Sequence, residues 1–229
     1  MAKALSTSEK FFGPGVYYFT LIDAITPIVL KHKYTFFSDE WFSEWTKSQK
    51  FSVEHMNFIL AWELVEKAHL AAVTALFRAK RWADAICLMY DNSNFIGWAA
   101  SLRGLLETAG DTVDGLRDIP FDLATHYHLI KSCLARKEKK SLYGFAEFES
   151  KLDHFVHARW MRTPRGVENK LKAKDSATYV ASLQKVLQGA VDLYHRLCAI
   201  SHPSNASLNY FYEFAPGPEG GTRARGQNH

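Results

Sequence analysis

Residues 52–80 read "SVEHMNFILAWELVEKAHLAAVTALFRAK", a long stretch without glycine or proline. Its apolar residues recur at the spacing of an α-helix, and Ser52 is of a residue type that caps helix N-termini. Four polar side chains share one arc of about 120°, at about 100° per residue: His55, Glu63, Glu66 and His69. Because the remaining surface is apolar, we expect one long helix that is mostly buried.

The same period continues along the chain, and it predicts further helices over 92–116, 121–140, 142–160 and from Asp175 or Ser176 to about Ser201. The helix over 92–116 carries an apolar stripe about 120° wide. It comprises Phe95, Trp98, Ala99, Leu102, Leu105, Leu106, Ala109, Val113 and Leu116. No stretch alternates in the way of a β-strand, so we expect an all-α helical bundle.

We expect three regions along the chain. Residues 1–51 form an aromatic-rich N-terminal extension, with shorter helices over 11–45 that pack on the bundle. Residues 52–214 form the bundle itself. Residues 215–229 read "APGPEGGTRARGQNH", and this glycine- and charge-rich composition predicts a disordered tail.

Composition favours a globular protein of the cytoplasm. The 229 residues are 47% apolar and 23% charged, with a net charge of +4 that is too small to indicate nucleic-acid binding by itself. The three cysteines are far apart and show no pairing pattern, which favours free thiols in a reducing compartment. The run 16–30, "VYYFTLIDAITPIVL", is shorter than a bilayer-spanning helix and contains Asp23 and Pro27, so we expect no membrane partner.

The last predicted helix ends on "RLCAISHP", residues 196–203. Arg196 points away from the main apolar stripe and is flanked by a second apolar strip of Leu193, Leu197 and Ile200, which predicts a dimer interface there. Pro203 disfavours a helical backbone at His202, so this residue is expected at the helix end. Arginine binds two phosphate oxygens at once and histidine titrates near neutrality, so this pair of residue types suits RNA cleavage by acid–base catalysis.

The stretch "RLCAISH" resembles the Arg-x4–6-His motif of HEPN domains, helical domains found in many prokaryotic RNases of defence and toxin–antitoxin systems. The longer "LYHRLCAISHPS" and the earlier "ASLRGLLETAGD" are also similar to bacterial HEPN-like families, and the resemblance covers about residues 52–212. It implies a dimer whose paired Arg/His sites cleave RNA without a metal or other cofactor. By position, Arg196 would bind phosphate and His202 would act as base or acid. An antitoxin or other protein is a further implied partner.

Arg103 and Glu107 lie one helical turn apart beside the apolar stripe of 92–116. They form either a surface ion pair of small energetic value or part of a catalytic cleft, with Glu107 orienting an arginine or a histidine. We include both residues with Arg196 and His202 in the candidate site.

Two alternatives stay open. The motif lacks the Asn, Asp or His that usually follows its arginine, which leaves room for a non-catalytic dimer that binds RNA or a protein, with basic clusters at 131–140 and 159–174 as phosphate contacts. A ferritin-like di-iron oxidase is a second alternative, because such bundles use Glu-x-x-His on two helices. Its ligands would come from Glu66, His69, Glu107, Glu147, Asp192 and His195.

Overall fold

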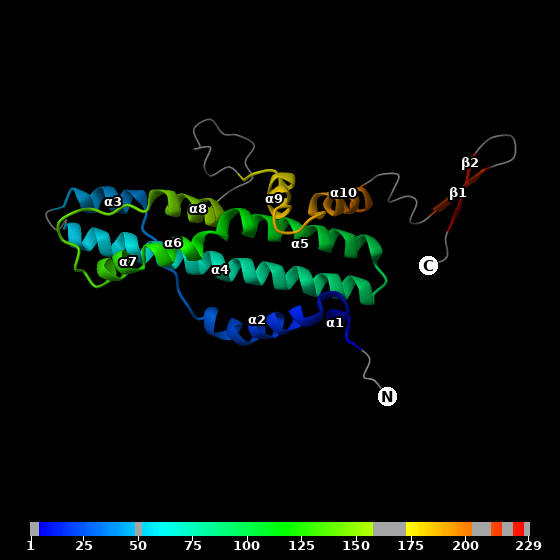
Figure 1. Cartoon of the computed structure of the whole chain (residues 1–229), viewed down its shortest axis with the longest axis horizontal. Helices are drawn as coiled ribbons and strands as arrows, with labels where there is room; N and C mark the ends of the chain where they lie inside the picture. Colours follow the sequence, from blue (N-terminus) through cyan, green and yellow to red (C-terminus); the bar gives the residue numbers. More distant parts are fainter. Residues whose placement is uncertain (1–4, 49–51, 158–172, 203–211, 217–221, 227–229) are drawn as a thin grey trace. The chain divides into compact units, whose positions relative to one another are not determined.

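A computed structural model of the chain describes residues 5–48, 52–157, 173–202, 212–216 and 222–226. Between residues 5 and 202 all of its regular structure is helical, as predicted (Figure 1). The chain divides into two compact units, each built from separate stretches. Unit 1 comprises Met1–Ile22, Arg78–Gly110 and Ser176–His229, and unit 2 comprises Asp23–Phe77 and Asp111–Asp175.

The longest helix is α4, Val53–Asp91, which extends past the predicted end at residue 80. Ser52 caps it as predicted, because its hydroxyl accepts a hydrogen bond from the backbone N–H of His55 at 3.2 Å. No glycine or proline interrupts the added turns, and Lys80 pairs with Asp84 one turn later at 2.6 Å. The helix therefore continues until Asn92, where the chain turns.

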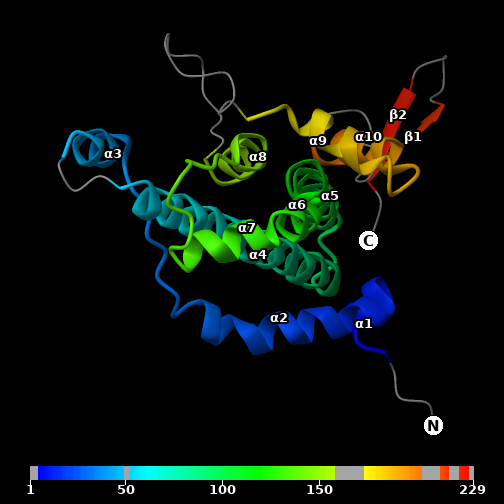
Figure 2. The ribbon, with the colours of Figure 1, turned by 60° about the vertical axis from the view of Figure 1, so that its left-hand side comes forward.

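Unit 2 has its core where the N-terminal half of α4 meets α6 (Ile119–Thr125), α7 (Tyr127–Leu134) and α8 (Ala146–His157) (Figure 2). The core side chains are Ala61, Leu64, Ala68, Ala71, Ile119, Ile130, Cys133, Phe145, Phe148 and Leu152. Also in this unit is α3, Asp39–Thr46, which Ser38 caps by accepting from the N–H of Trp41 at 3.2 Å. Apolar burial against α4 thus organises this unit.

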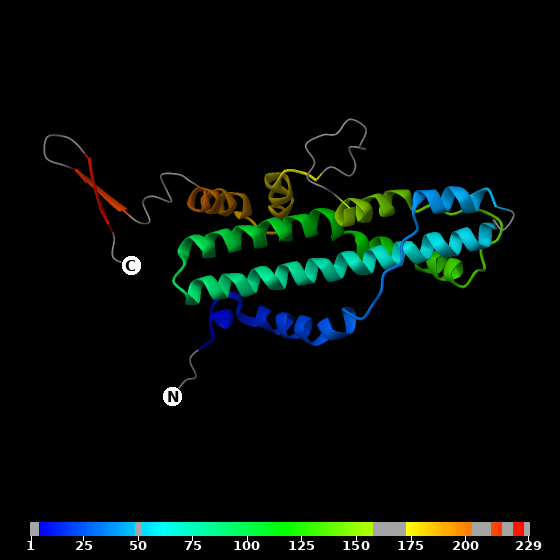
Figure 3. The same cartoon turned by 180° about the vertical axis from the view of Figure 1, so that it is seen from behind.

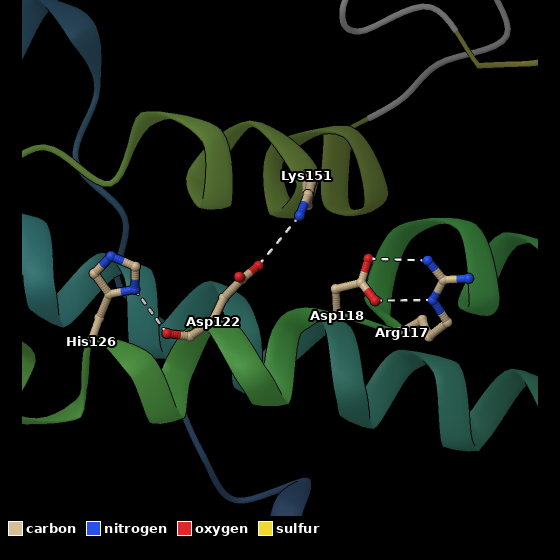
Figure 4. Close-up of polar contacts among 5 residues, drawn as sticks. All are labelled: Arg117, Asp118, Asp122, His126 and Lys151. Atoms are coloured by element: carbon tan, nitrogen blue, oxygen red, sulfur yellow. Dashed lines mark hydrogen bonds and ion pairs between the residues drawn. The ribbon is translucent and has the colours of Figure 1, made fainter.

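The single helix predicted over 121–140 is instead the pair α6 and α7, which meet at His126. Figure 4 shows that the His126 ring donates from Nδ1 to the carbonyl of Asp122 at 2.9 Å. The backbone N–H of His126 bonds the same carbonyl at 3.0 Å, and the break lies in the backbone of His126 itself, with φ of −93° and ψ of 5°. Asp122 also pairs with Lys151 of α8 at 3.3 Å, which joins α6 to α8.

In unit 1, the C-terminal half of α4 and the start of α5 (Phe95–Leu116) run antiparallel, side by side (Figure 3). They approach closely at Gly104, where an added Cβ would lie 2.6 Å from the Trp82 ring. Gly110 likewise has the backbone of Tyr179 at 2.5 Å from a built Cβ, which brings α9 (Ser176–Leu183) against α5. Glycine at these two positions permits close contacts that a Cβ atom would block.

The predicted final helix is also divided in two, into α9 and α10 (Ala190–Ser201). Gly189 stands at the N-cap of α10 with φ of 83°, a left-handed conformation that favours glycine. Val180, Leu183, Ala190 and Leu197 of these two helices are buried. Further along, β1 (Tyr212–Pro216) pairs antiparallel with β2 (Thr222–Gly226), whereas the sequence predicts disorder from residue 215.

The N-terminal stretch begins with α1 (Thr7–Phe12), a short 3-10 turn η1 (Gly13–Gly15) and α2 (Val16–Val29). Together, Thr7–Val29 form a helical segment of 23 residues that is long and apolar enough to cross a membrane by length and composition. The apolar run that the sequence shows over 16–30 is thus the C-terminal part of a longer helical segment, to which α1 and η1 contribute.

Candidate active site

His202 ends α10, as the proline that follows it predicts. Its backbone is extended, with φ of −100° and ψ of 158°, while its N–H still donates to the carbonyl of Cys198 at 3.0 Å. The ring is exposed and leaves the helix axis at this point. The position thus combines a fixed backbone with an accessible imidazole.

Arg103 of α5 contacts this helix end. Its Nη1 lies 2.7 Å from Nε2 of His202 and 3.0 Å from Oγ of Ser201. The Ser201 hydroxyl accepts from Arg103 and donates to the carbonyl of Leu197 at 2.8 Å. Because a guanidinium only donates, Nε2 of His202 is the acceptor in this contact, which requires the tautomer with its proton on Nδ1.

Glu107 lies behind the guanidinium. Its Oε1 is 3.5 Å from Nε of Arg103 and accepts a hydrogen bond from the Tyr194 hydroxyl at 3.1 Å. Nε of Arg103 is itself buried and has no hydrogen-bond partner among the described residues, so Glu107 acts on it by charge at ion-pair distance. We call Arg103, Glu107, Tyr194, Ser201 and His202 the Arg103 cluster.

Tyr194 remains a donor throughout the neutral range. Burial raises the pKa of its phenol most, and the nearby Cys198 thiol and Glu107 carboxylate raise this pKa further. The protonated hydroxyl therefore holds one oxygen of Glu107 in place. Tyr194 and Ser201 are the members that the sequence pattern did not identify, since tyrosine reads as part of the apolar stripe and serine as an ordinary helix-end residue.

Arg196, the arginine of the sequence motif, lies outside the Arg103 cluster. Its side chain is exposed and makes no hydrogen bond or ion pair within the part of the chain that the structure describes. The apolar strip predicted around it is only partly a surface: Leu193 is 39% exposed, but Leu197 is 2% exposed. Leu197 packs into unit 1 because α10 contacts its neighbours with part of this second strip as well as with its main apolar stripe.

Two residues of the di-iron alternative, Glu66 and His69, have other partners. Glu66 pairs with His32 at 3.0 Å, and Nδ1 of His69 lies 2.8 Å from the Tyr34 hydroxyl. Asp192 and His195 are exposed on α10 in unit 1, while Glu66 and His69 belong to unit 2. The side chain of Glu147 lies outside the described residues. Among those described, no group of three or more His, Cys, Asp or Glu could hold a metal ion.

The middle of the polar arc of α4, at Glu63 and Glu66, is covered, while His69 stays exposed. The segment after α2 lies along it, where His32 bonds Glu66, Tyr34 bonds His69, and the backbone N–H of Phe37 donates to Glu63 at 2.6 Å. Glu63 and Glu66 are consequently buried. The arc therefore binds the N-terminal part of unit 2.

Several residues of the predicted basic clusters have partners inside the protein. Arg136 stacks over the Phe58 ring at 4.6 Å, Lys139 pairs with Glu54 at 3.4 Å, and Lys174 pairs with Asp114. The other cations of the second cluster, Arg159, Arg162, Arg165, Lys170 and Lys172, lie outside the described residues.

A scan against protein-family models and searches of curated proteins and of solved structures found no match to the chain. The likeness to HEPN domains therefore rests on the sequence pattern, and the function is inferred from the Arg103 cluster.

Proposed function

We propose that the protein is a metal-independent endoribonuclease whose catalytic centre is the contact between Arg103 and His202. The observation that carries this proposal is the distance of 2.7 Å between the guanidinium and the imidazole at an exposed helix end. A phosphate-binding cation and a proton-transferring base are the two groups that cleavage of RNA at its 2′-hydroxyl requires. The HEPN-like sequence pattern adds a bacterial defence or toxin–antitoxin setting to the proposal.

The first step is binding of the scissile phosphate by Arg103. The phosphate competes with His202 for Nη1 and so releases Nε2 of the neutral imidazole. Glu107, held by Tyr194, keeps the guanidinium oriented while its partner changes. Glu107 and Tyr194 are therefore positioning residues, whereas Arg103 and His202 touch the reacting groups.

The second step is transfer of the phosphoryl group. Nε2 of His202 takes the proton of the 2′-hydroxyl, O2′ attacks the adjacent phosphorus, and the bond from phosphorus to O5′ breaks. The departing O5′ takes a proton from the partner subunit's His202, which would have left its own Arg103 and taken up a proton from solvent before the step. The products are a 2′,3′-cyclic phosphate and a 5′-hydroxyl, with no net proton released.

Arg196 enters the proposal through this dimer. It is exposed on α10 beside the partly exposed Leu193, so a second chain seated there would bring two Arg196 guanidinium groups near one RNA strand. Its role would be to bind a flanking phosphate and not to contact His202 of its own chain.

The test is incubation of the full chain with total RNA in excess EDTA, alongside His202→Ala and His195→Ala. We expect the wild type and His195→Ala to cleave and His202→Ala to lose cleavage by about 100-fold or more. His195 is the matched control because it is an exposed histidine on the same helix. Circular dichroism of His202→Ala should match the wild type. A folded His202→Ala protein that cuts RNA at the wild-type rate would refute the catalytic role.

A second candidate function is favoured by one observation. The guanidinium of Arg103 is already engaged by His202, Ser201 and Glu107, an arrangement that also serves to fix α10 on α5. The protein would then be a non-catalytic helical dimer that binds RNA or a partner protein. Retardation of RNA in a gel without any cleavage by the wild type would select this candidate.

A further inference from the structure

The helix α2 carries large apolar side chains on a face that the protein leaves open. At about 100° per residue, five of them fall within an arc of about 100°. They are Tyr17, Tyr18, Leu21, Ile25 and Ile28, each between 37% and 71% exposed. We call this set the α2 stripe. The adjoining face of α2 is the buried one: there Ile22 is 6% exposed and Phe19 is half-buried.

The segment that contains α2 is held to α4 at both of its ends. On the N-terminal side, Thr7 donates to Asp91 at 2.6 Å and the Phe11 ring meets the Tyr90 ring edge-on at 4.9 Å. On the C-terminal side, His32 pairs with Glu66 at 3.0 Å. Each of these contacts lies within one unit, and the stripe is exposed in both: Tyr17, Tyr18 and Leu21 in unit 1, and Ile25 and Ile28 in unit 2.

The charges around the α2 stripe indicate what covers it. No acidic or basic residue falls within its arc, and Asp23 projects from the opposite side of the helix. Lys31 and Lys33 follow the helix immediately, and both are exposed. Tyr17 and Tyr18 begin the stripe, and tyrosine is enriched where a membrane meets water. An apolar stripe bordered by lysines complements lipid tails beneath anionic phosphates.

We propose that α2 docks this protein flat on the surface of an anionic phospholipid bilayer. The stripe enters the boundary between headgroups and acyl chains, while Lys31 and Lys33 bind lipid phosphates. A second copy of the stripe fits less well, because the stripe carries no acidic residue to meet these lysines. The proposal replaces the sequence-based expectation of no membrane partner, and it is independent of RNA cleavage.

The test is flotation of the full chain with vesicles of phosphatidylcholine alone and of an equal mixture with phosphatidylglycerol. We expect the wild type to float with the anionic vesicles and to be released by high salt. The double variant Ile25→Glu/Ile28→Glu should bind the anionic vesicles at least about tenfold more weakly than the wild type, because it places two charges in the apolar layer. Phe121→Glu is the matched control, since Phe121 is 74% exposed on α6, outside α2.

A second variant, Lys31→Glu/Lys33→Glu, tests the headgroup contacts and keeps the stripe intact. It should lose the preference for anionic vesicles. Equal flotation of the wild type and Ile25→Glu/Ile28→Glu, or no flotation of the wild type, would overturn the proposal. Resistance of the bound wild type to alkaline carbonate would overturn the flat orientation in favour of a spanning helix. A wild-type dimer that avoids vesicles and is split by Ile28→Glu would assign the stripe to a second copy.

Discussion

Two residues in this protein show how their surroundings set what a side chain can do. Arg103 donates to Nε2 of His202, so this nitrogen is the acceptor in the contact. Glu63 carries a charge that the fold disfavours. It is 4% exposed on α4, and burial raises the pKa of its carboxyl more than its hydrogen bond from Phe37 lowers it.

The Glu63→Gln variant should therefore be more stable than the wild type at neutral pH. A raised carboxyl pKa means that Glu63 stabilises the fold most below its unfolded pKa, and this stabilisation is lost as pH rises through the folded pKa. Glutamine keeps an oxygen for the Phe37 N–H and carries no charge. Thermal unfolding across a pH series should show a gain in Tm at neutral pH that shrinks in acid. A gain that is constant with pH, or a loss at neutral pH, would contradict the buried-charge explanation.

At the scale of elements, a single buried side chain fixes the connection between α7 and α8. Asn57 of α4 is 1% exposed and makes three hydrogen bonds to that connection. Its amide nitrogen donates to the carbonyls of Glu138 and Ser141 at 3.0 and 2.9 Å, and its oxygen accepts from the N–H of Tyr143 at 3.0 Å. The connection thereby leads the chain into α8 at the point where Phe145 and Phe148 enter the core.

Replacing Asn57 with alanine should lower the free energy of unfolding by about 3 kcal/mol, or about 1 kcal/mol for each buried hydrogen bond. Asn57→Asp should be no better, because a carboxylate cannot donate to the two carbonyls. Urea unfolding followed by circular dichroism measures both. Asn92→Ala is the control, since Asn92 is exposed and its side-chain amide donates to the carbonyl of Leu88. Equal stability of Asn57→Ala and the control would show that the three bonds contribute nothing.

The sequence predicted the helices that a continuous apolar period produces. It did not predict the interruptions, each of which is caused by a single residue. Continuous apolar periods predicted α4 and α5, including the cap at Ser52. The break at His126 lies in the backbone of that one residue, and the break before α10 depends on the backbone of Gly189. Neither break alters the apolar pattern, so the sequence predicted one continuous helix at each of these two places.

The candidate site was predictable by residue but not by pairing. The sequence selected Arg103, Glu107 and His202, yet it paired His202 with Arg196, its neighbour on the same helix. The structure instead places Arg103 against His202 across 99 residues. Such a contact depends on the packing of α10 on α5, which the close approach at Gly110 permits from the α9 side. A single sequence carries no signal for that distance.

For the whole molecule, the proposed catalysis depends on a second chain, since one imidazole cannot both take and supply a proton in the same step. Leu193 and Arg196 are the exposed residues of α10 that such a partner would meet. Leu197 cannot serve this purpose because it is buried within its own unit.

Leu193→Glu should split the dimer and reduce RNA cleavage about tenfold or more, because it places an unpaired charge in a desolvated interface. Leu197→Glu should instead unfold the protein, with a loss of about 4 kcal/mol for a buried charge without a partner. Light scattering, thermal unfolding and cleavage assays on both variants separate the two effects. Leu142→Glu, an exposed leucine in unit 2, is the control. A wild-type monomer that cleaves RNA would contradict the need for a partner.

The chemistry at His202 is tested most directly by the ends of the RNA fragments. An oligoribonucleotide incubated with the full chain in excess EDTA should yield 2′,3′-cyclic phosphate and 5′-hydroxyl ends, and a matched oligonucleotide with 2′-deoxyribose throughout should stay intact. His202→Ala should yield neither product end. Cleavage that requires a divalent metal, that leaves 3′-hydroxyl and 5′-phosphate ends, or that proceeds on the deoxy substrate would contradict attack by the 2′-hydroxyl with His202 as its base.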